Sequence, residues 1–193
     1  DYRKTQIMAE YQVNAVGEKH GWFKGYNQEG VIVYEYNYKN NLQDGLNKEY
    51  SVYGGRKLAQ TETYKAGVLH GPAVYYFDGT GIREKGSYKE GEYHGEWLVI
   101  KMLAIDRSAY SDEIKKGTQY LKETYYYDKG KRVYPDGEIK AYYHPSNTLY
   151  SVERYFNGKP TGDHVWYNPD GTVSRQHHFD TPEEIKIKEE KNV

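Results

Sequence analysis

Six polar residues, each directly before a regularly spaced glycine, are the side chains in this sequence most suited to bind a metal. The row consists of His20, Asp44, His70, His94, Asp136 and Thr161. If the spacing comes from a repeat of strand pairs, equivalent residues lie two strands apart, about 9–10 Å. A zinc ion needs its histidine nitrogens at about 2.0–2.1 Å. We therefore expect polar residues at the edges of turns, with no metal and no cofactor.

The sequence offers little for covalent or acid–base catalysis. It contains no cysteine, which excludes disulfides, zinc thiolates and a cysteine nucleophile. It also lacks a Gly-x-Ser-x-Gly elbow. The adjacent carboxylates at Asp112-Glu113 and Glu183-Glu184 are typical of solvated surface, whereas general acid–base chemistry needs a partly buried carboxyl group. His177 and His178 point to opposite faces of an expected strand and cannot chelate one ion together. We predict that the chain is not an enzyme.

The charge balance excludes two classes of partner. Lys and Arg number 27 against 28 Asp and Glu, so the formal net charge is −1. A nucleic-acid binder usually carries a basic patch or stripe, and a membrane clamp carries a polybasic one. No run approaches the ~18 apolar residues of a membrane span, so we expect a soluble chain. The thiol-free, tyrosine-rich composition and the start at Asp1 favour the bacterial cell envelope or a secreted protein, although a cytoplasmic protein could have the same composition.

Glycines and aromatic residues recur in a common register that defines six units. The anchoring glycines are Gly21, Gly45, Gly71, Gly95, Gly137 and Gly162. Five residues after each stands a first aromatic row, made of Tyr26, Tyr50, Tyr76, Tyr142 and Tyr167, with Ile100 in the fourth unit. A second row closes each unit with Tyr38, Tyr64, Tyr88, Tyr127, Tyr155 and Phe179. Because glycine tolerates positive φ in a tight link and tyrosine favours strands, each unit predicts two antiparallel strands joined by turns.

The register Tyr-x-x-Gly-x-x-x-Gly-x-x-x-x-Tyr, complete in Tyr64–Gly67–Gly71–Tyr76, resembles the MORN repeat. It is most similar to the variant MORN repeats of the bacterial YwqK-type family, which is labelled antitoxin-like. The likeness covers roughly residues 14–180. It implies an all-β fold, an elongated single-layer antiparallel sheet of consecutive MORN-like β-hairpins. The family label would imply a protein that binds and blocks a toxin.

The repeat divides the chain into three parts. Residues 1–20 form a capping half repeat, residues 21–180 form six hairpins, and residues 181–193 form a charged tail, either a last edge strand or disordered. The fourth hairpin carries a long insert at about 101–120, in which Ser111 predicts the start of a short helix. Insertions in repeat proteins often lie on the binding face. The residues Tyr110, Arg107 and Ile105 are therefore candidate partner contacts, and a functionless insertion is the alternative.

The aromatic residues have two possible roles. With 24 Tyr and 3 Trp but only 4 Phe, we expect a thin core and much half-exposed aromatic surface. The rings either form this core or provide a binding surface, with Trp22, Trp97 and Trp166 as a possible aromatic platform. Strand alternation places Trp97 and Trp166 on one side and Trp22 on the other. We predict a non-enzymatic scaffold for a protein partner. The alternatives are a carbohydrate or cell-wall binding module and a protein that associates with itself.

Overall fold

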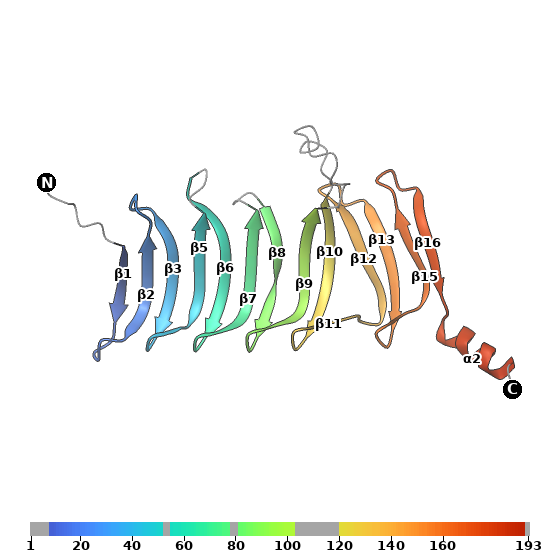
Figure 1. Cartoon of the computed structure of the whole chain (residues 1–193), viewed down its shortest axis with the longest axis horizontal. Coiled ribbons are helices and arrows are strands. Elements are labelled where there is room, and N and C mark those ends of the chain that lie inside the picture. Colours follow the sequence, from blue (N-terminus) through green and yellow to red (C-terminus); the bar gives the residue numbers. More distant parts are fainter. Residues whose placement is uncertain (1–7, 52–54, 78–80, 103–119, 192–193) are drawn as a thin grey trace. The chain divides into compact units, whose positions relative to one another are not determined.

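The computed structural model describes residues 8–51, 55–77, 81–102 and 120–191. These residues form an all-β chain with strands that follow one another as antiparallel hairpins (Figure 1). The strand order in the sheet is β1-β2-β3-β5-β6-β7-β8-β9-β10-β12-β13-β15-β16, and the short strands β4, β11 and β14 pair with β3, β10 and β13. The predicted fold class, a single antiparallel sheet of hairpin repeats, is confirmed.

The chain forms two compact units, residues 1–95 and residues 96–193. The first contains β1 (Ala9–Val13), β2 (Lys19–Tyr26), β3 (Ile32–Lys39), β4 (Leu42–Gln43), β5 (Gly45–Ser51), β6 (Lys57–Lys65), β7 (Val68–Phe77) and β8 (Gly81–Lys89). The boundary falls within β9 (Glu92–Met102). The second contains β10 (Tyr120–Asp128), β11 (Lys131–Val133), β12 (Gly137–His144), β13 (Leu149–Phe156), β14 (Lys159–Pro160), β15 (Gly162–Tyr167), β16 (Val173–Phe179) and α2 (Pro182–Lys191).

Five of the six anchoring glycines lie directly opposite the aromatic residue that ends the same unit. These pairs are Gly21 with Tyr38, Gly45 with Tyr64, Gly71 with Tyr88, Gly137 with Tyr155, and Gly162 with Phe179. All six anchoring glycines have φ between 62° and 111°. This region is costly for residues with a Cβ. A cross-strand aromatic side chain beside a glycine restores packing that the glycine lacks. The regular spacing in the sequence therefore reflects a cross-strand pair of a glycine and an aromatic residue that recurs along the sheet.

The tight links between strands explain the second glycine of the motif. Both central residues have positive φ in the links Asn40-Asn41, Ala66-Gly67, Glu90-Gly91, Lys129-Gly130 and Asn157-Gly158. Two positive φ values in succession define the type I′ turn, whose twist matches that of paired strands. Asn41 can replace glycine in the first unit because asparagine tolerates this conformation better than most residues.

Each tyrosine of the first aromatic row lies at a β-bulge in its hairpin. The pairing shifts immediately before Tyr26, Tyr50, Tyr76, Tyr142 and Tyr167. In each case the second strand contributes one extra residue. A bulge increases the local twist and changes the direction of nearby side chains. The two aromatic rows therefore have different structural roles, one at a bulge and one opposite a glycine.

The core is thin, as the composition predicts. Among the described residues the buried hydrophobic side chains are Ala73, Tyr88, Trp97, Ile100, Leu121, Ala141, Tyr143 and Val152. Four buried residues stand two positions after an anchoring glycine, namely Asn47, Ala73, Trp97 and His164. This position therefore faces the more enclosed side of each strand pair.

The two ends of the chain have different secondary structure. β1 pairs with β2 in antiparallel orientation, at the end where the sequence predicts a capping half repeat. The tail is a helix, so the expectation of an edge strand or a disordered segment was wrong. Thr181 and Glu184 form a capping box, in which each backbone N–H is bound by the other side chain, at 2.7 and 3.3 Å. Pro182 at the first helical position also favours a helix start.

Candidate partner-binding surface

Three residues of the polar row before the anchoring glycines contact the turns between strands. Asp44 accepts a hydrogen bond from the backbone N–H of Ala66 at 3.0 Å, and Asp136 accepts one from Asn157 at 2.6 Å. In the first hairpin, His20 Nδ1 lies 3.1 Å from the side-chain oxygen of Asn40. Each contact joins the start of a hairpin to the tight turn that follows its second strand. This is the turn-edge role that the strand spacing predicts.

A different group in the described part of the chain brings three ligand-type atoms together. His178, Asp180 and Glu184 offer one ligand atom each, and these atoms lie within 4.8 Å of one another. All three residues already have partners in the protein: His178 contacts two carboxylates, Asp180 pairs with Lys188, and Glu184 also caps α2. Because these contacts occupy the group, we assign no metal to it.

The sheet of the first unit has a face dominated by tyrosines and glutamates, which we call the tyrosine face. Tyr36 donates a hydrogen bond to Glu49. Glu62 accepts hydrogen bonds from Tyr64 at 2.9 Å and from Tyr75 at 2.7 Å. In the second unit Tyr125 donates to Glu123, and Tyr155 donates to Glu153 at 2.8 Å. These hydroxyl groups are satisfied within the protein. Two of the tyrosines, Tyr64 and Tyr155, belong to the second aromatic row, which supports the interpretation of that row as part of the core.

The surroundings of these tyrosines change their acidity. Burial raises the pKa of Tyr36 well above its usual value, and the hydrogen bond to Glu49 raises it further. Burial and the hydrogen bonds to Tyr88 and Glu62 do the same for the pKa of Tyr75. Both effects favour the protonated phenol because an ionised one would be desolvated and would face a carboxylate. The hydroxyl groups therefore act as donors across the neutral pH range.

The opposite face of the first unit carries an open groove at Trp22, which we call the Trp22 groove. It has a volume of about 270 Å³, and its lining residues on this face are Trp22, Lys24, Glu35, Asn37, Leu46 and Lys48. Trp22 is 39% exposed and Leu46 is 45% exposed. In register, Lys24 lies opposite Glu35, and Glu35 lies opposite Lys48. The groove thus combines exposed apolar surface with charged side chains on three neighbouring strands.

The charges in the Trp22 groove are unequally compensated. Glu35 accepts a hydrogen bond from Tyr50 at 2.5 Å and pairs with Arg56 at 3.2 Å. Lys24 lies over the Trp22 ring, with its ammonium 5.2 Å from the ring centroid. Within the described ranges, neither Lys24 nor Lys48 has a carboxylate within ion-pair distance. The groove therefore presents two ammonium groups beside its apolar surface.

The three predicted platform residues do not share one surface. Trp97 is fully buried, with 0% of its surface exposed, so its use as a stacking platform was wrong. It stands two residues after Gly95, in the enclosed position. Trp166 is half-buried, and Arg175 lies over its ring at 5.3 Å. Trp22 alone of the three is exposed, because it stands one residue after its glycine and faces the other side.

The insert of the fourth hairpin lies between β9 and β10. The predicted contacts Ile105, Arg107 and Tyr110 and the expected short helix fall within 103–119, outside the described residues. Their assignment stays a prediction.

Two features of the described structure were not predicted from the sequence. One is the tyrosine–glutamate network, which a repeated Glu-x-Tyr pattern at 62–64, 123–125 and 153–155 could have indicated, because residues two apart share a strand face. The other is the capping box of α2, visible as Thr181-x-x-Glu184.

No protein-family model matches the chain, and no curated protein matches its sequence. The resemblance to MORN repeats therefore depends on the motif and its spacing. In the ranges that the structure covers, none of the helical residues forms a segment with the length and apolar character needed to cross a membrane.

Proposed function

We propose that this chain is a non-enzymatic repeat scaffold that binds a protein partner through the Trp22 groove. The observation that carries the proposal is an exposed tryptophan beside an exposed leucine in a charged setting. Protein interfaces are enriched in tryptophan, and a few such residues usually supply most of the binding energy. The tyrosine face supports this choice of surface, because its hydroxyl groups already bond to glutamates within the protein.

The charges of the groove define the kind of partner. Lys24 and Lys48 flank Glu35, which Arg56 and Tyr50 compensate. A partner segment with an apolar side chain next to one or two carboxylates would complement this arrangement. Electrostatic complementarity of this kind mainly increases specificity and the association rate. The proposed partner is therefore an acidic segment with an apolar anchor.

The resemblance to the YwqK-type family supports a narrower version of the proposal. If the chain acts as an antitoxin, its partner is a toxin that the scaffold blocks on binding. The insert near Tyr110 would then offer a second contact. Both statements rest on the sequence motif and its spacing.

A photo-crosslinking amino acid in place of Leu46 tests the proposal in extract from the source cells. The crosslinked peptide, identified by mass spectrometry, should be acidic and contain an apolar anchor. The same substitution at Val68 is a matched control, because Val68 is 46% exposed and lies on another strand. Equal crosslinking from both positions, or none from Leu46, would contradict the assignment of the groove.

Substitutions separate the groove from the insert. Trp22→Ala should abolish capture of the crosslinked partner, whereas Val68→Ser should retain it. Deletion of 104–118 should weaken capture only if the insert is a second contact. If the partner still bound Trp22→Ala, the Trp22 groove would not be the binding site. Binding to cell-wall polysaccharide that depends on Trp22 would instead favour the carbohydrate-binding alternative.

A further inference from the structure

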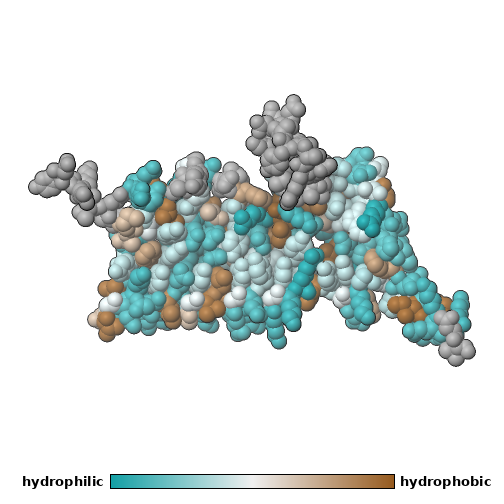
Figure 2. Space-filling view, viewed as in Figure 1, coloured by the Kyte–Doolittle hydropathy of each residue, from teal (hydrophilic) through white to brown (hydrophobic). Residues whose placement is uncertain are grey.

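The C-terminal helix α2 is attached to the protein by polar contacts. None of its described residues is buried, and Ile185 and Ile187 are 45% and 48% exposed. Figure 2 shows the corresponding apolar surface open to solvent on this helix. Two residues apart on a helix, these side chains point in different directions and form no apolar stripe. Hydrophobic packing therefore does not fix the position of α2.

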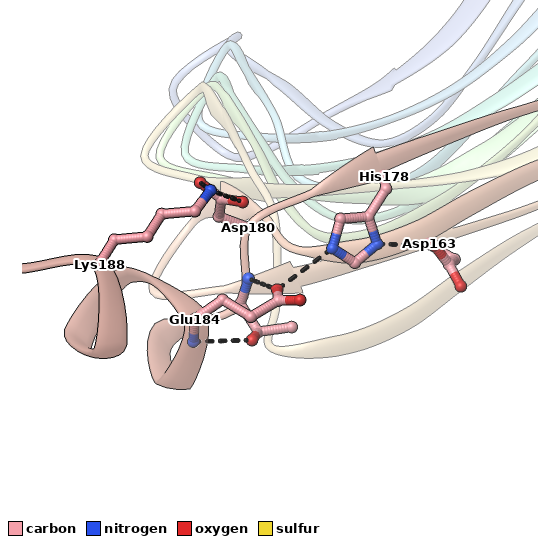
Figure 3. Close-up of polar contacts among 6 residues, drawn as sticks. Asp163, His178, Asp180, Glu184 and Lys188 are labelled. Atoms are coloured by element: carbon pink, nitrogen blue, oxygen red, sulfur yellow. Dashed lines mark hydrogen bonds and ion pairs between the residues drawn. The ribbon is translucent and has the colours of Figure 1, made fainter. Parts of the chain in front are cut away.

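One histidine links the helix to the last hairpin (Figure 3). His178 on β16 lies with Nδ1 2.7 Å from Asp163 Oδ1 on β15 and with Nε2 3.1 Å from Glu184 Oε2 on α2. Both partners are carboxylates and both accept hydrogen bonds. An imidazole ring can donate from both nitrogens only when it is protonated. The geometry is thus that of an imidazolium ion between two carboxylates.

The charged groups around His178 come from four elements or links. Asp163 and Glu184 contact the ring directly. Beyond Asp163, Arg154 on β13 donates to the backbone carbonyl of Asp163 at 2.6 Å. Asp180, in the link between β16 and α2, pairs with Lys188 at 2.7 Å. An Asp180 oxygen also lies within 4.8 Å of a His178 ring nitrogen. Lysine and aspartate stay charged around neutral pH, so the pair between Asp180 and Lys188 persists when His178 loses its proton.

We propose that protonated His178 is a latch that holds α2 against the last hairpin and releases it as the pH rises. Deprotonation leaves the ring with one N–H, which cannot donate to both carboxylates. The contact to α2 or the contact to β15 is then lost. The Lys188–Asp180 pair remains as a tether, so the helix loosens without leaving the protein.

The pH range follows from the directions of the pKa shifts. Asp163, and then Glu184, raise the pKa of His178 above its ordinary 6.5. The contribution of His178 is therefore complete below pH 6.5 and disappears as the pH rises through the raised value. His178 lowers the pKa of Asp163, and the capping contacts with Thr181 lower that of Glu184 to about 2. These carboxylates keep their charge until the solution is strongly acidic, so the latch is closed in mildly acid solution.

Release of the latch would open a pocket in the second unit. This pocket has a volume of about 340 Å³, and residues Thr181, Pro182 and Glu183 at the start of α2 form one of its walls. The facing wall includes Arg154, Tyr155, Phe156 and Thr161. Movement of α2 would expose Phe156 and neighbouring apolar surface further. The latch thus couples pH to the accessibility of this pocket.

Hydrogen exchange of the full chain tests the latch. Protection factors of the α2 amides, corrected for intrinsic exchange, should fall about threefold between pH 5.5 and pH 8.5. His178→Gln should show the lower protection at both values. His20→Gln is the matched control, since it removes an exposed strand histidine whose side chain contacts Asn40 and lies far from α2 in the sequence. This control should keep the pH dependence of the original chain.

A second variant tests the mechanism without changing the helix. Asp163→Asn removes one carboxylate next to His178, so the midpoint of the pH transition should move down by about one unit. Nuclear magnetic resonance of the His178 ring should show the same shift. Protection of α2 that does not change with pH in the original chain would overturn the proposal. An unchanged midpoint in Asp163→Asn would do so as well.

Discussion

Trp22 and Trp97 are the same residue type in equivalent strands, yet one lies on the surface and the other in the core. Trp22 follows Gly21 by one residue and is 39% exposed, whereas Trp97 follows Gly95 by two and is 0% exposed. Successive side chains of a strand point to opposite faces. A single step in register relative to the anchoring glycine therefore separates a candidate binding residue from a packing residue.

The same comparison applies to the two faces of the first unit. On the tyrosine face the hydroxyl groups bond to glutamates, and Ala73 and Asn47 are buried in the position equivalent to Trp97. On the other face Trp22 and Leu46 are exposed beside lysines. A count of aromatic residues does not distinguish the buried face from the exposed one. The position of each aromatic residue relative to its anchoring glycine does distinguish them.

The largest expected effect is that of Trp97→Ala. Removal of a fully buried indole should lower the free energy of unfolding by about 3–5 kcal/mol. Chemical denaturation followed by circular dichroism measures this change. Trp22→Ala is the control in the same assay and should have a much smaller effect. Similar losses of unfolding free energy for both variants would contradict the assignment of Trp97 to the core and Trp22 to the surface.

The next effect concerns the anchoring glycines. Gly71 has φ of 109°, and a Cβ there would lie 3.3 Å from the side chain of Thr63. Gly71→Ala should lower the free energy of unfolding by about 1–2 kcal/mol, because the backbone conformation disfavours a side chain. Gly81 has open space around its Cβ position and no positive φ, so Gly81→Ala serves as the control. Equal effects of the two substitutions would show that the anchor register is not a structural requirement.

A smaller effect is expected within the tyrosine face. Tyr75 donates to Glu62 and contacts the hydroxyl of Tyr88, so Tyr75→Phe should cost about 1 kcal/mol. Because burial and these contacts raise the pKa of Tyr75 above 10.0, its contribution is present below pH 10 and lost as the pH rises further. Denaturation between pH 8 and 11 should show a decrease for the original chain. The decrease should be shallower for Tyr75→Phe, and equal slopes would argue against the network.

The smallest effect on stability is expected for Asp44→Ala. It removes one exposed hydrogen bond to the backbone of Ala66 and should cost about 0.5–1 kcal/mol. Thermal unfolding detects a change of this size. Asp44→Asn, which keeps an acceptor oxygen, should restore most of the loss. An unchanged unfolding midpoint in Asp44→Ala would show that this hydrogen bond does not stabilise the turn.

The sequence predicts much of this fold because the repeat depends on local chemistry. Glycine at 67 or 91 is needed for positive φ in a tight turn, and this requirement is visible in the spacing. Tyr64 and Tyr88 lie opposite the anchoring glycines Gly45 and Gly71, and the regular spacing of these residues also indicates that pairing. Six copies of the pattern make the strand order predictable, since each hairpin pairs with the next.

The candidate surface was less predictable for two physical reasons. The exposure of Trp22 and Leu46 depends on how neighbouring strands align, and the groove requires residues from β2, β3 and β5 together. The helix at the C-terminal end depends on a capping box formed by Thr181 and Glu184, while the alternation of Ile185 and Ile187 with lysines suggested a strand. The capping box stabilises the helix more than the short alternation of isoleucine and lysine favours a strand.

Calorimetric titration with the partner identified by crosslinking tests the central claim most directly. Trp22→Ala should weaken binding at least about 30-fold, as expected for loss of an interface residue worth about 2 kcal/mol or more. The unfolding midpoint of the same variant should stay close to that of the original chain. An unchanged dissociation constant for Trp22→Ala, in a variant that remains folded, would contradict the assignment of this face as the binding surface.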